Sequence, residues 1–294
     1  MGENQYDNLT EIVKIACSVG WGAGDILRSY YRGEVNEGDL EIDDKKGDPV
    51  TAADLAANHY ILKHLKEALG EEDFGYLSEE TYKAQGSKPV DHPWVWIIDP
   101  LDGTRDFIEK TGEYAVHIAL THNQRPVLSV VVIPETEKVY FATKGGGTFV
   151  ETRDGTVKPI SVAKRDRIED LSLVASRSHR NKRLNMMLER IPFQSRHFVG
   201  SVGRKISTIL EQQCDVYISL SGKTAPKDWD FAAPELILTE AGGKFTSFDG
   251  KDLTYNNPDV SQWGGLMASN GPCHQELYTT ATKVLGEIDA ELAE

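Results

Sequence analysis

The stretch WIIDPLDGT, residues 96–104, decides both the fold and the site of this chain. Its apolar run ends at Asp99, which predicts a strand that delivers this carboxylate to the edge of a sheet. Pro100 denies Asp99 a helical conformation, and Asp102 follows close behind. The Gly-Thr pair that ends the stretch can open a helix whose free N–H groups point outward. Two carboxylates beside a helix N-terminus indicate a site that holds cations and a phosphate group together.

The two carboxylates of this stretch require a counter-ion. Two like charges about 4 Å apart repel by about 4 kcal/mol at an effective dielectric of about 20. Carboxylates without His or Cys beside them favour Mg²⁺, with Mn²⁺ as a substitute. Taken singly, the Asp-Pro and Asp-Gly pairs would indicate ordinary turns. The combined pattern of Asp99, Pro100, Asp102, Gly103 and Thr104 is far more specific, so we interpret it as a metal site.

The charge of the chain limits its partners. Its 294 residues carry 32 Lys and Arg against 46 Asp and Glu, a formal net charge of −14. Such a chain repels a phosphate backbone, so we expect no nucleic-acid polymer as a partner. An anionic small molecule needs local cations, either basic side chains or bound metal, to bind here. With 39% hydrophobic residues, the chain can nevertheless form a globular core.

The cysteines and the apolar runs indicate a cytoplasmic protein. The chain has 3 cysteines, Cys17, Cys214 and Cys273, which are too few and too far apart for a disulfide framework. The N-terminal residues show neither the basic nor the apolar region of a secretory signal. No apolar run approaches the roughly 20 residues of a membrane span, so we expect no membrane partner. The histidine spacing disfavours zinc.

The first half predicts a helix pair on a mostly antiparallel sheet. Apolar residues at helical spacing predict helices over 9–30 and 51–68, with a loop or hairpin at 36–50 and a polar loop at 81–93. Apolar runs predict strands at 95–98, 114–120, 126–133, 139–142 and 148–150. The glycines at 145–147 lack the Lys-Ser/Thr pair of a phosphate loop and indicate a hairpin turn.

The second half alternates strands and helices, which is typical of an α/β layer. The predicted elements are strands at 171–175, 197–199 and 216–218 and helices at 181–190, 204–212 and 231–241. We place the boundary in the basic stretch near residue 165. This divides the chain into an N-terminal α+β half, residues 1–165, and a C-terminal α/β half, residues 166–294.

Four other stretches accompany the metal-site stretch along the chain. They are DPVTAAD (48–54), LSEE (77–80), SRSH (176–179) and WDFAAPE (229–235). Together with WIIDPLDGT they resemble the signature of the lithium-sensitive, Mg²⁺-dependent phosphatases of the inositol monophosphatase superfamily. The resemblance covers about residues 10–275. It implies a layered αβαβα sandwich with the active site between the halves.

Within that superfamily the sequence is most similar to the 3′(2′),5′-bisphosphate nucleotidases. GTRDFI (103–108) resembles their Gly-Thr-Lys-Glu-Phe-Ile, where inositol monophosphatases usually have Gly-Thr-Thr-Asn-Phe. GEYAVHIAL (112–120), SRSH (176–179) and GSVGRK (200–205) match the same subfamily. The sequence departs from that pattern at Arg105-Asp106, which replace Lys-Glu. It also departs at Lys227, which lies one residue farther from Trp229 than in some members.

The resemblance implies a role for each acidic residue. Glu79, Asp99 and the Leu101 carbonyl would hold one Mg²⁺, and Asp99, Asp102 and Asp230 a second, within a total of two or three ions. Thr104, hydrogen-bonded to Asp54, would position and help deprotonate the attacking water, with assistance from Glu79. Glu80 would lie beside the metal ligands without binding metal. The residues alone allow plainer interpretations: Thr51 and Asp54 have capping-box spacing, and Asp230 could be an ordinary first-turn acid.

The substrate side follows from the same resemblance. The N–H groups of Gly103 and Thr104 would hold phosphate oxygens, and Asp230 would also face the substrate. The nucleotide side would be formed by Ser176, His179, Gly200, Ser201, Arg204 and Lys205. The basic groups in these motifs are Arg177, His179, Arg204 and Lys205. One of Arg204 and Lys205 would meet the uncleaved phosphate or the adenine face, and we favour Lys205.

The expected activity is therefore hydrolysis of a small phosphate monoester. The closest resemblance implies 3′-phosphoadenosine 5′-phosphate as substrate, with AMP and phosphate as products, and a link to sulfate assimilation. An inositol monophosphatase or sugar-bisphosphate phosphatase of the same superfamily is the alternative. A non-catalytic regulator that binds metal and phosphate is a third interpretation. The sequence leaves a homodimer open.

Overall fold

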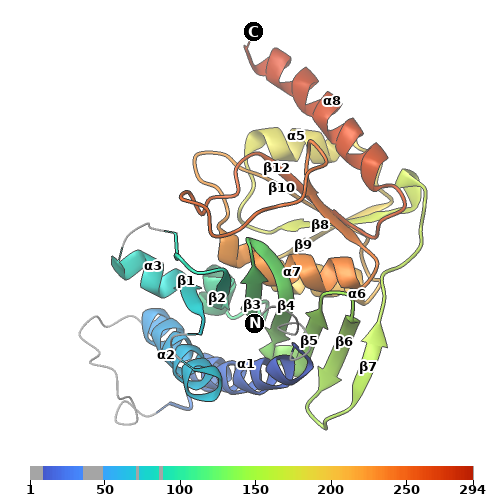
Figure 1. The fold of residues 1–294 in the computed structure, drawn as a ribbon. Coiled ribbons are helices and arrows are strands. Elements are labelled where there is room, and N and C mark those ends of the chain that lie inside the picture. Colours follow the sequence, from blue (N-terminus) through green and yellow to red (C-terminus); the bar gives the residue numbers. More distant parts are fainter. Residues whose placement is uncertain (1–8, 36–48, 71–72, 86–88, 294) are drawn as a thin grey trace.

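The structure is a computed structural model that describes residues 9–35, 49–70, 73–85 and 89–293. Figure 1 shows its layers. The predicted hairpin or loop at 36–50 lies almost entirely outside the described residues, and α2 begins at Pro49. None of the described helices is long and apolar enough to cross a membrane.

The first half is built on a seven-stranded sheet whose strands follow one another in chain order. β1 pairs with β2 in parallel and all later pairs are antiparallel. Short turns join the strands from β3 to β7, which suits antiparallel pairing. The strands are β1 (Gly75–Ser78), β2 (Trp94–Asp102), β3 (Ala115–His122), β4 (Arg125–Ile133), β5 (Lys138–Thr143), β6 (Gly147–Thr152) and β7 (Val157–Ile160). The turn at 145–147 joins β5 to β6, as the sequence predicts.

Two long helices cover one face of this sheet, α1 (Leu9–Arg32) and α2 (Pro49–Leu69). Their apolar faces share one core cluster with the side chains on that face of β2, β3 and β4, for example Leu27, Ile61, Trp96, Ile118 and Val130. Short helices α3 (Glu79–Gln85) and α4 (Thr104–Ile108) lie directly after β1 and β2. Part of the loop predicted at 81–93 is therefore wrong, because α3 extends to Gln85.

The second half contains a five-stranded sheet in the order β11-β12-β10-β8-β9. Its strands are β8 (Ser172–Ser176), β9 (Ser195–Val199), β10 (Val216–Leu220), β11 (Lys244–Ser247) and β12 (Gly265–Ser269). Helices α5 (Lys182–Arg190) and α8 (His274–Ala293) share a core cluster with its outer face. The sequence predicted neither β11, β12 nor α8.

Helices α6 (Val202–Leu210) and α7 (Asp228–Glu240) form the middle layer between the two sheets. Their buried side chains, such as Ile206, Ile209 and Phe231, belong to one cluster with residues of both sheets. The order of layers is thus helix, sheet, helix, sheet, helix, which confirms the expected αβαβα sandwich. The boundary near residue 165 falls between β7 and β8. The division of the chain into two halves at this point stays a prediction. The halves share a core, in which α6 and α7 pack against residues of both sheets.

The middle helices begin earlier than predicted. Ser201 caps α6, since its side chain accepts a hydrogen bond from the Arg204 N–H, and the helix starts at Val202 instead of Arg204. α7 starts at Asp228 instead of Phe231, and its N-terminus is closed by contacts between Lys227 and Asp230. Both helix starts lie beside the metal-site stretch of β2, so these caps position functional side chains.

Candidate active site

Strand β2 carries the first two carboxylates of the site. Its pairing with β3 is regular up to Asp99 and shifts in register between Asp99 and Asp102. In this irregular segment the Leu101 N–H donates to Asp99 Oδ1 at 3.0 Å. Gly103 then turns the chain into α4 with a φ of 90°, a conformation that favours glycine. The sequence thus brings both carboxylates to the end of a buried strand, as predicted.

Asp230 joins them from the other half of the molecule. Carboxylate oxygens of Asp99, Asp102 and Asp230 lie within 4.8 Å of one another. Asp99 and Asp102 are buried, and Asp230 is partly exposed on the first turn of α7. This cluster contains three of the predicted metal ligands.

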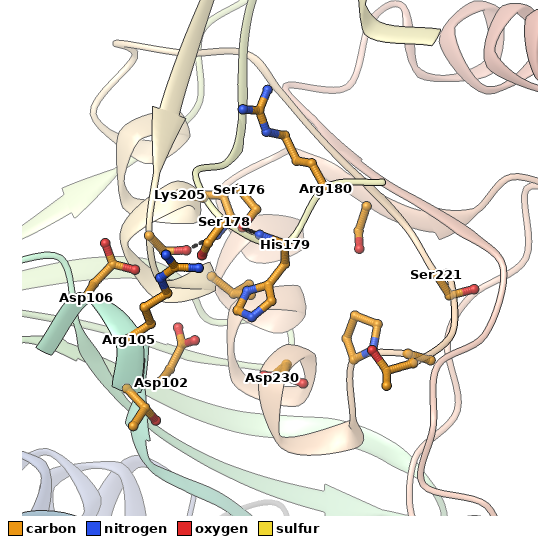
Figure 2. Close-up of a pocket in the computed structure, with 18 of the residues that line it drawn as sticks. Asp102, Arg105, Asp106, Ser176, Ser178, His179, Arg180, Lys205, Ser221 and Asp230 are labelled. Atoms are coloured by element: carbon orange, nitrogen blue, oxygen red, sulfur yellow. Dashed lines mark hydrogen bonds between the residues drawn. The ribbon is translucent and has the colours of Figure 1, made fainter. Parts of the chain in front are cut away.

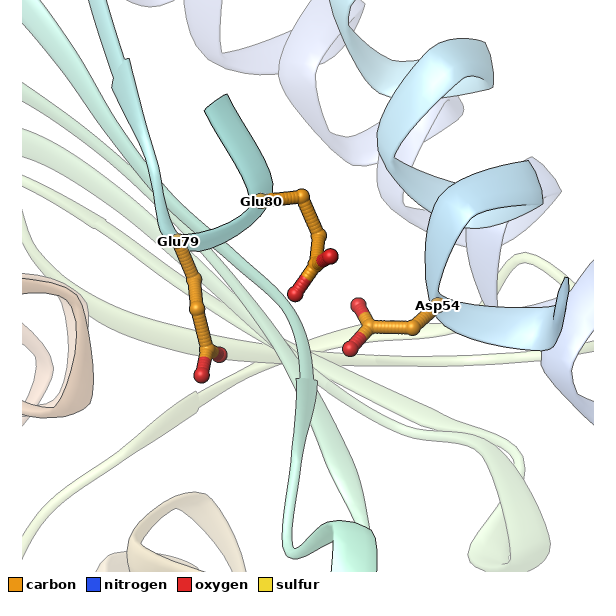
Figure 3. A group of neighbouring side chains, drawn as sticks. All are labelled: Asp54, Glu79 and Glu80. Atoms are coloured by element: carbon orange, nitrogen blue, oxygen red, sulfur yellow. The ribbon is translucent and has the colours of Figure 1, made fainter. Parts of the chain in front are cut away.

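A second carboxylate cluster contains Asp54, Glu79 and Glu80, whose oxygens also lie within 4.8 Å of one another (Figure 3). Asp54 projects from α2, and the two glutamates open α3. Asp54 Oδ1 is buried, and it has no hydrogen-bond partner among the described residues. Lys83, one turn along α3, lies 2.9 Å from Glu79 and 2.6 Å from Glu80.

The crowding of these acids changes their protonation. Burial, followed by the charges of Glu79 and Asp102, raises the pKa of Asp99 well above its usual range. Burial and then Asp102 raise the pKa of Asp230 to about 7. Burial and then the charges of Glu80 and Glu79 raise the pKa of Asp54 to about 8. Each shift means that the charged form is unfavourable without a counter-ion, which is the electrostatic condition for strong binding of a divalent cation.

Asp102 is the exception, because it already has partners. Although its burial opposes ionisation, His117, Lys205 and the Gly203 N–H lower the pKa of Asp102. His117 Nε2 lies 3.1 Å from Asp102 Oδ2, and the Gly203 N–H donates to the same oxygen at 2.8 Å. These contacts fix the orientation of one carboxylate before any metal binds.

The donor set fits Mg²⁺ or Mn²⁺. The two clusters contain only carboxylate oxygens, with no Cys or His among their members. Within the part of the chain that the structure describes, the buried Asp54 Oδ1 has no hydrogen-bond partner. Asp99, Asp102, Asp230 and Glu79 are the residues that would hold the ions.

One predicted contact is wrong. Thr104 Oγ1 donates to the Leu101 carbonyl at 3.3 Å and makes no hydrogen bond to Asp54 among the described residues. The reason is geometric: Thr104 is the first residue of α4, and its hydroxyl folds back onto the strand that precedes it. Leu101 O, a predicted metal ligand, is the acceptor of this bond.

A pocket of about 710 Å³ opens above the first cluster (Figure 2). Its metal side is lined by Glu79, Asp99, Asp102 and Asp230. Its other walls come from the loops after β8 and β10, and from α4. Seven of the predicted substrate-side residues line it: Gly103, Thr104, Ser176, His179, Gly200, Lys205 and Asp230.

Two predicted substrate-side residues do not line this pocket. Ser201 is buried and its hydroxyl caps α6. Arg204 turns away, because its Nη1 donates to Ser207 Oγ at 2.8 Å and lies 3.8 Å from Glu211.

Lys205 is a buried cation in the wall of the pocket. Its Nζ donates to the Gly200 carbonyl and lies 5.4 Å from the centre of the Tyr217 ring. Burial lowers the pKa of Lys205 to about 8, while Asp102 and other carboxylates oppose this shift.

Sequence reasoning missed several residues of the site. His117 is fully buried in β3, and a histidine inside an otherwise apolar strand was the available signal. Arg105, Arg180 and Lys223 line the pocket as further cations. Only the fold brings these positions together.

Comparisons with known proteins agree with this geometry. A model of the inositol monophosphatase family matches residues 8–287. A 3′(2′),5′-bisphosphate nucleotidase CysQ of Salmonella typhimurium is 36% identical over 242 residues, which are 81% of this chain and 92% of the relative. The 3′(2′),5′-bisphosphate nucleotidase CysQ of Aggregatibacter actinomycetemcomitans is 30% identical over 250 residues, which are 84% of this chain and 88% of the relative.

Solved structures show the same fold. An inositol monophosphatase from Anabaena superposes with a TM-score of 0.73 at 24% identity, covering 94% of this chain and 97% of the other. A Thermotoga maritima IMPase gives a TM-score of 0.73 at 23% identity, over 94% of this chain and 98% of the other. The layered fold, the carboxylate clusters and the family match together define a metal-dependent phosphatase. The chain belongs to the inositol monophosphatase family.

Proposed function

We propose that the protein is a 3′(2′),5′-bisphosphate nucleotidase that converts 3′-phosphoadenosine 5′-phosphate to AMP and phosphate. The observation that carries the proposal is the lining of the pocket. Carboxylates line one side, and another part of the same cavity is lined by Ser176, His179, Arg180 and Lys223. A substrate with two separated phosphates can use both regions. The CysQ relatives support the same substrate class.

The chain supplies most of the groups that the reaction needs. Mg²⁺ bound by Asp99, Asp102, Asp230 and Glu79 would activate water and stabilise the leaving oxygen. Gly103 and Thr104 line the pocket, and their N–H groups would hold oxygens of the cleaved phosphate. Thr104 Oγ1 would orient the water once its hydroxyl turns from the Leu101 carbonyl.

The proton of the water would pass to Glu79, which lines the pocket and shares the second carboxylate cluster with Asp54. No side-chain nucleophile is needed, and phosphate leaves with an oxygen atom from water.

Lys205 is the better of the two candidate cations for the uncleaved phosphate. It lines the pocket, whereas Arg204 is engaged with Ser207 on the other side of α6. Its ammonium donates to the Gly200 carbonyl, which holds the charge in place beneath the nucleotide side.

Further properties belong to the same proposal. We propose Mg²⁺ as the natural ion, with Li⁺ as an inhibitor that competes for the second metal position. The cellular role would be removal of a by-product of sulfate assimilation in the cytoplasm. A homodimer stays a prediction.

A substrate panel tests the proposal. Phosphate release is measured with Mg²⁺ from 3′-phosphoadenosine 5′-phosphate, inositol 1-phosphate and fructose 1,6-bisphosphate, with the Asp99→Asn variant as control. We expect the bisphosphate nucleotide to give the highest kcat/KM. A preference for either other substrate would replace the proposed substrate, and no release from any would favour the non-catalytic regulator.

A further inference from the structure

The end of β8 and the loop that follows it carry several pocket residues, among them Ser176 and His179, with Arg177 between these two. Arg177 itself does not line the pocket. Its guanidinium reaches back to the first half, where Nη1 lies 2.6 Å from Asp106 Oδ1 and Nη2 lies 2.8 Å from Glu113 Oε2. One side chain therefore joins the substrate-side loop to two carboxylates that follow the metal-site stretch.

Both carboxylates are held by further contacts. Asp106 is 3% exposed and accepts a hydrogen bond from Thr111 Oγ1 at 3.0 Å. Glu113 Oε2 also accepts from the Gly200 N–H at 2.7 Å. Gly200 packs directly on Asp106, because a Cβ at this position would lie 2.1 Å from Asp106 Cγ. The arrangement is a packed network and differs from a solvated surface ion pair, which would contribute little.

Backbone contacts complete the junction. The Arg177 N–H donates to the Val199 carbonyl at 3.1 Å, which ties the loops after β8 and β9 together. The Ser201 N–H donates to the Glu113 carbonyl at 3.1 Å, which ties the second of these loops to the segment before β3. The guanidinium is the only side-chain group on the loop itself, within the described residues, that pairs with carboxylates of the first half.

We propose that Arg177 is a positioning residue that clamps the substrate-side loop against the first half, so that Ser176 and His179 face the pocket at a fixed place relative to the metal ligands. This inference rests on the proposed function, because it assigns the loop to that substrate. Arg177 was one of the basic groups considered for the second phosphate. Its two terminal nitrogens already bind Asp106 and Glu113, so it acts through the loop and leaves the phosphate to other cations.

The test compares three variants. Arg177→Met removes both ion pairs, and Arg177→Lys keeps a charge that can reach one carboxylate only. Arg183→Met is the matched control, since Arg183 pairs with Asp289 at 2.6 Å and is 40% exposed, against 37% for Arg177, but it lies on α5 away from the pocket. Each variant is measured for kcat and KM and for amide hydrogen exchange in residues 176–181.

Arg177→Met should raise the KM for 3′-phosphoadenosine 5′-phosphate about tenfold or more, with a smaller loss of kcat. It should also accelerate exchange in the loop. Arg177→Lys should recover part of both effects, and Arg183→Met should change neither. The clamp would be overturned if Arg177→Met showed the same loop exchange and the same KM as the Arg183→Met control. It would also be overturned if Arg177→Met and Arg177→Lys lost kcat equally while loop exchange did not change.

The two proposals fail separately. If the wild-type protein does not release phosphate from 3′-phosphoadenosine 5′-phosphate, the proposed function is wrong. The exchange measurement still decides the clamp, because it needs no substrate. Unchanged exchange in Arg177→Met refutes the clamp even if the wild-type protein hydrolyses that substrate.

Discussion

The close approach of α6 to the first sheet should be required for both stability and metal binding, and Gly203→Ala tests this. Gly203 lies on the first turn of α6. A Cβ added there would lie 2.5 Å from His117 Nε2, 2.7 Å from Ala115 Cβ and 3.0 Å from Val131 Cγ1. Since carbon atoms pack at about 3.5–4.0 Å, α6 would have to move by about 1 Å away from β3.

The expected cost follows from two opposing effects. Alanine is favoured over glycine inside a helix by about 0.5–1 kcal/mol. Overpacking in a well-filled core costs about 1–3 kcal/mol. Gly286→Ala isolates the first effect, because Gly286 lies in α8 with nothing within 4 Å of its Cβ position. The difference in unfolding free energy between the two alanine variants should therefore be about 1–3 kcal/mol.

The same shift should weaken the metal site. The Gly203 N–H donates to Asp102 Oδ2, so movement of α6 loosens this support, and the added Cβ would press on His117, which contacts the same oxygen. Loss of such a supporting contact typically lowers metal affinity by about 10–100-fold.

Urea unfolding followed by circular dichroism and calorimetric titration with Mg²⁺ or Mn²⁺ measure the two effects. We expect Gly286→Ala to be slightly more stable than the wild-type protein and to bind metal equally well. If Gly203→Ala unfolds at the same urea concentration as Gly286→Ala and keeps the wild-type metal affinity, the packing argument is refuted.

Three further outcomes are expected. Asp99→Asn should abolish most phosphate release yet raise the metal-free melting temperature in calorimetry, because burial and the neighbouring carboxylates make an ionisable group unfavourable at this position; near-normal turnover at modest Mg²⁺ would contradict the metal assignment. Burial and then Lys244 lower the pKa of His274 to about 4, below about 6.5 in the unfolded chain, so the unfolded state binds the extra proton. The contribution of His274 to the unfolding free energy should thus fall by roughly 3 kcal/mol between pH 6.5 and 4. Urea titrations at several pH values should show this contribution as the difference in slope between the wild-type protein and His274→Asn, because the buried carboxyls with raised pKa titrate alike in both. Lys205→Met should raise the KM for the bisphosphate nucleotide by about tenfold or more, whereas Arg204→Met should stay within about twofold in the same assay, and the reverse order would exchange their roles.

The first half of the fold could be predicted from its apolar patterns because its strands are long and nearly continuous. Residues 126–133, for example, form β4 almost as predicted, and short turns leave little choice of pairing. In contrast, α8 was missed although Leu277, Ala281 and Ile288 have helical spacing and are its buried apolar residues. Its stripe is narrow and most of its other residues are exposed, so the periodic signal is weak.

The carboxylates that the structure gathers into two clusters could be singled out because each stands in a local motif, but the proposed substrate side could not be resolved in the same way. Arg204 and Lys205 are neighbours on α6, and neighbours differ by about 100° around a helix. Only one can face the pocket, and the choice depends on how α6 packs between two sheets. The bond between Thr104 and Leu101 likewise depends on where α4 begins, which the sequence did not specify.

The two regions of the pocket rest on different kinds of support. Asp99 and Asp102 lie on β2, and Asp230 lies on α7, a helix inside the shared core. His117 connects them, since its Nε2 faces Asp102 and its Nδ1 lies 3.2 Å from the Trp229 carbonyl, next to Asp230.

The substrate side, by contrast, is built mainly from loops, residues 176–181 after β8 and 221–226 after β10. Loops tolerate substitution better than packed strands and helices do. The chain would therefore keep its metal chemistry while these loops change the substrate. This division fits a family that contains CysQ nucleotidases, and it places the expected choice of substrate in the loops that the proposed Arg177 clamp holds.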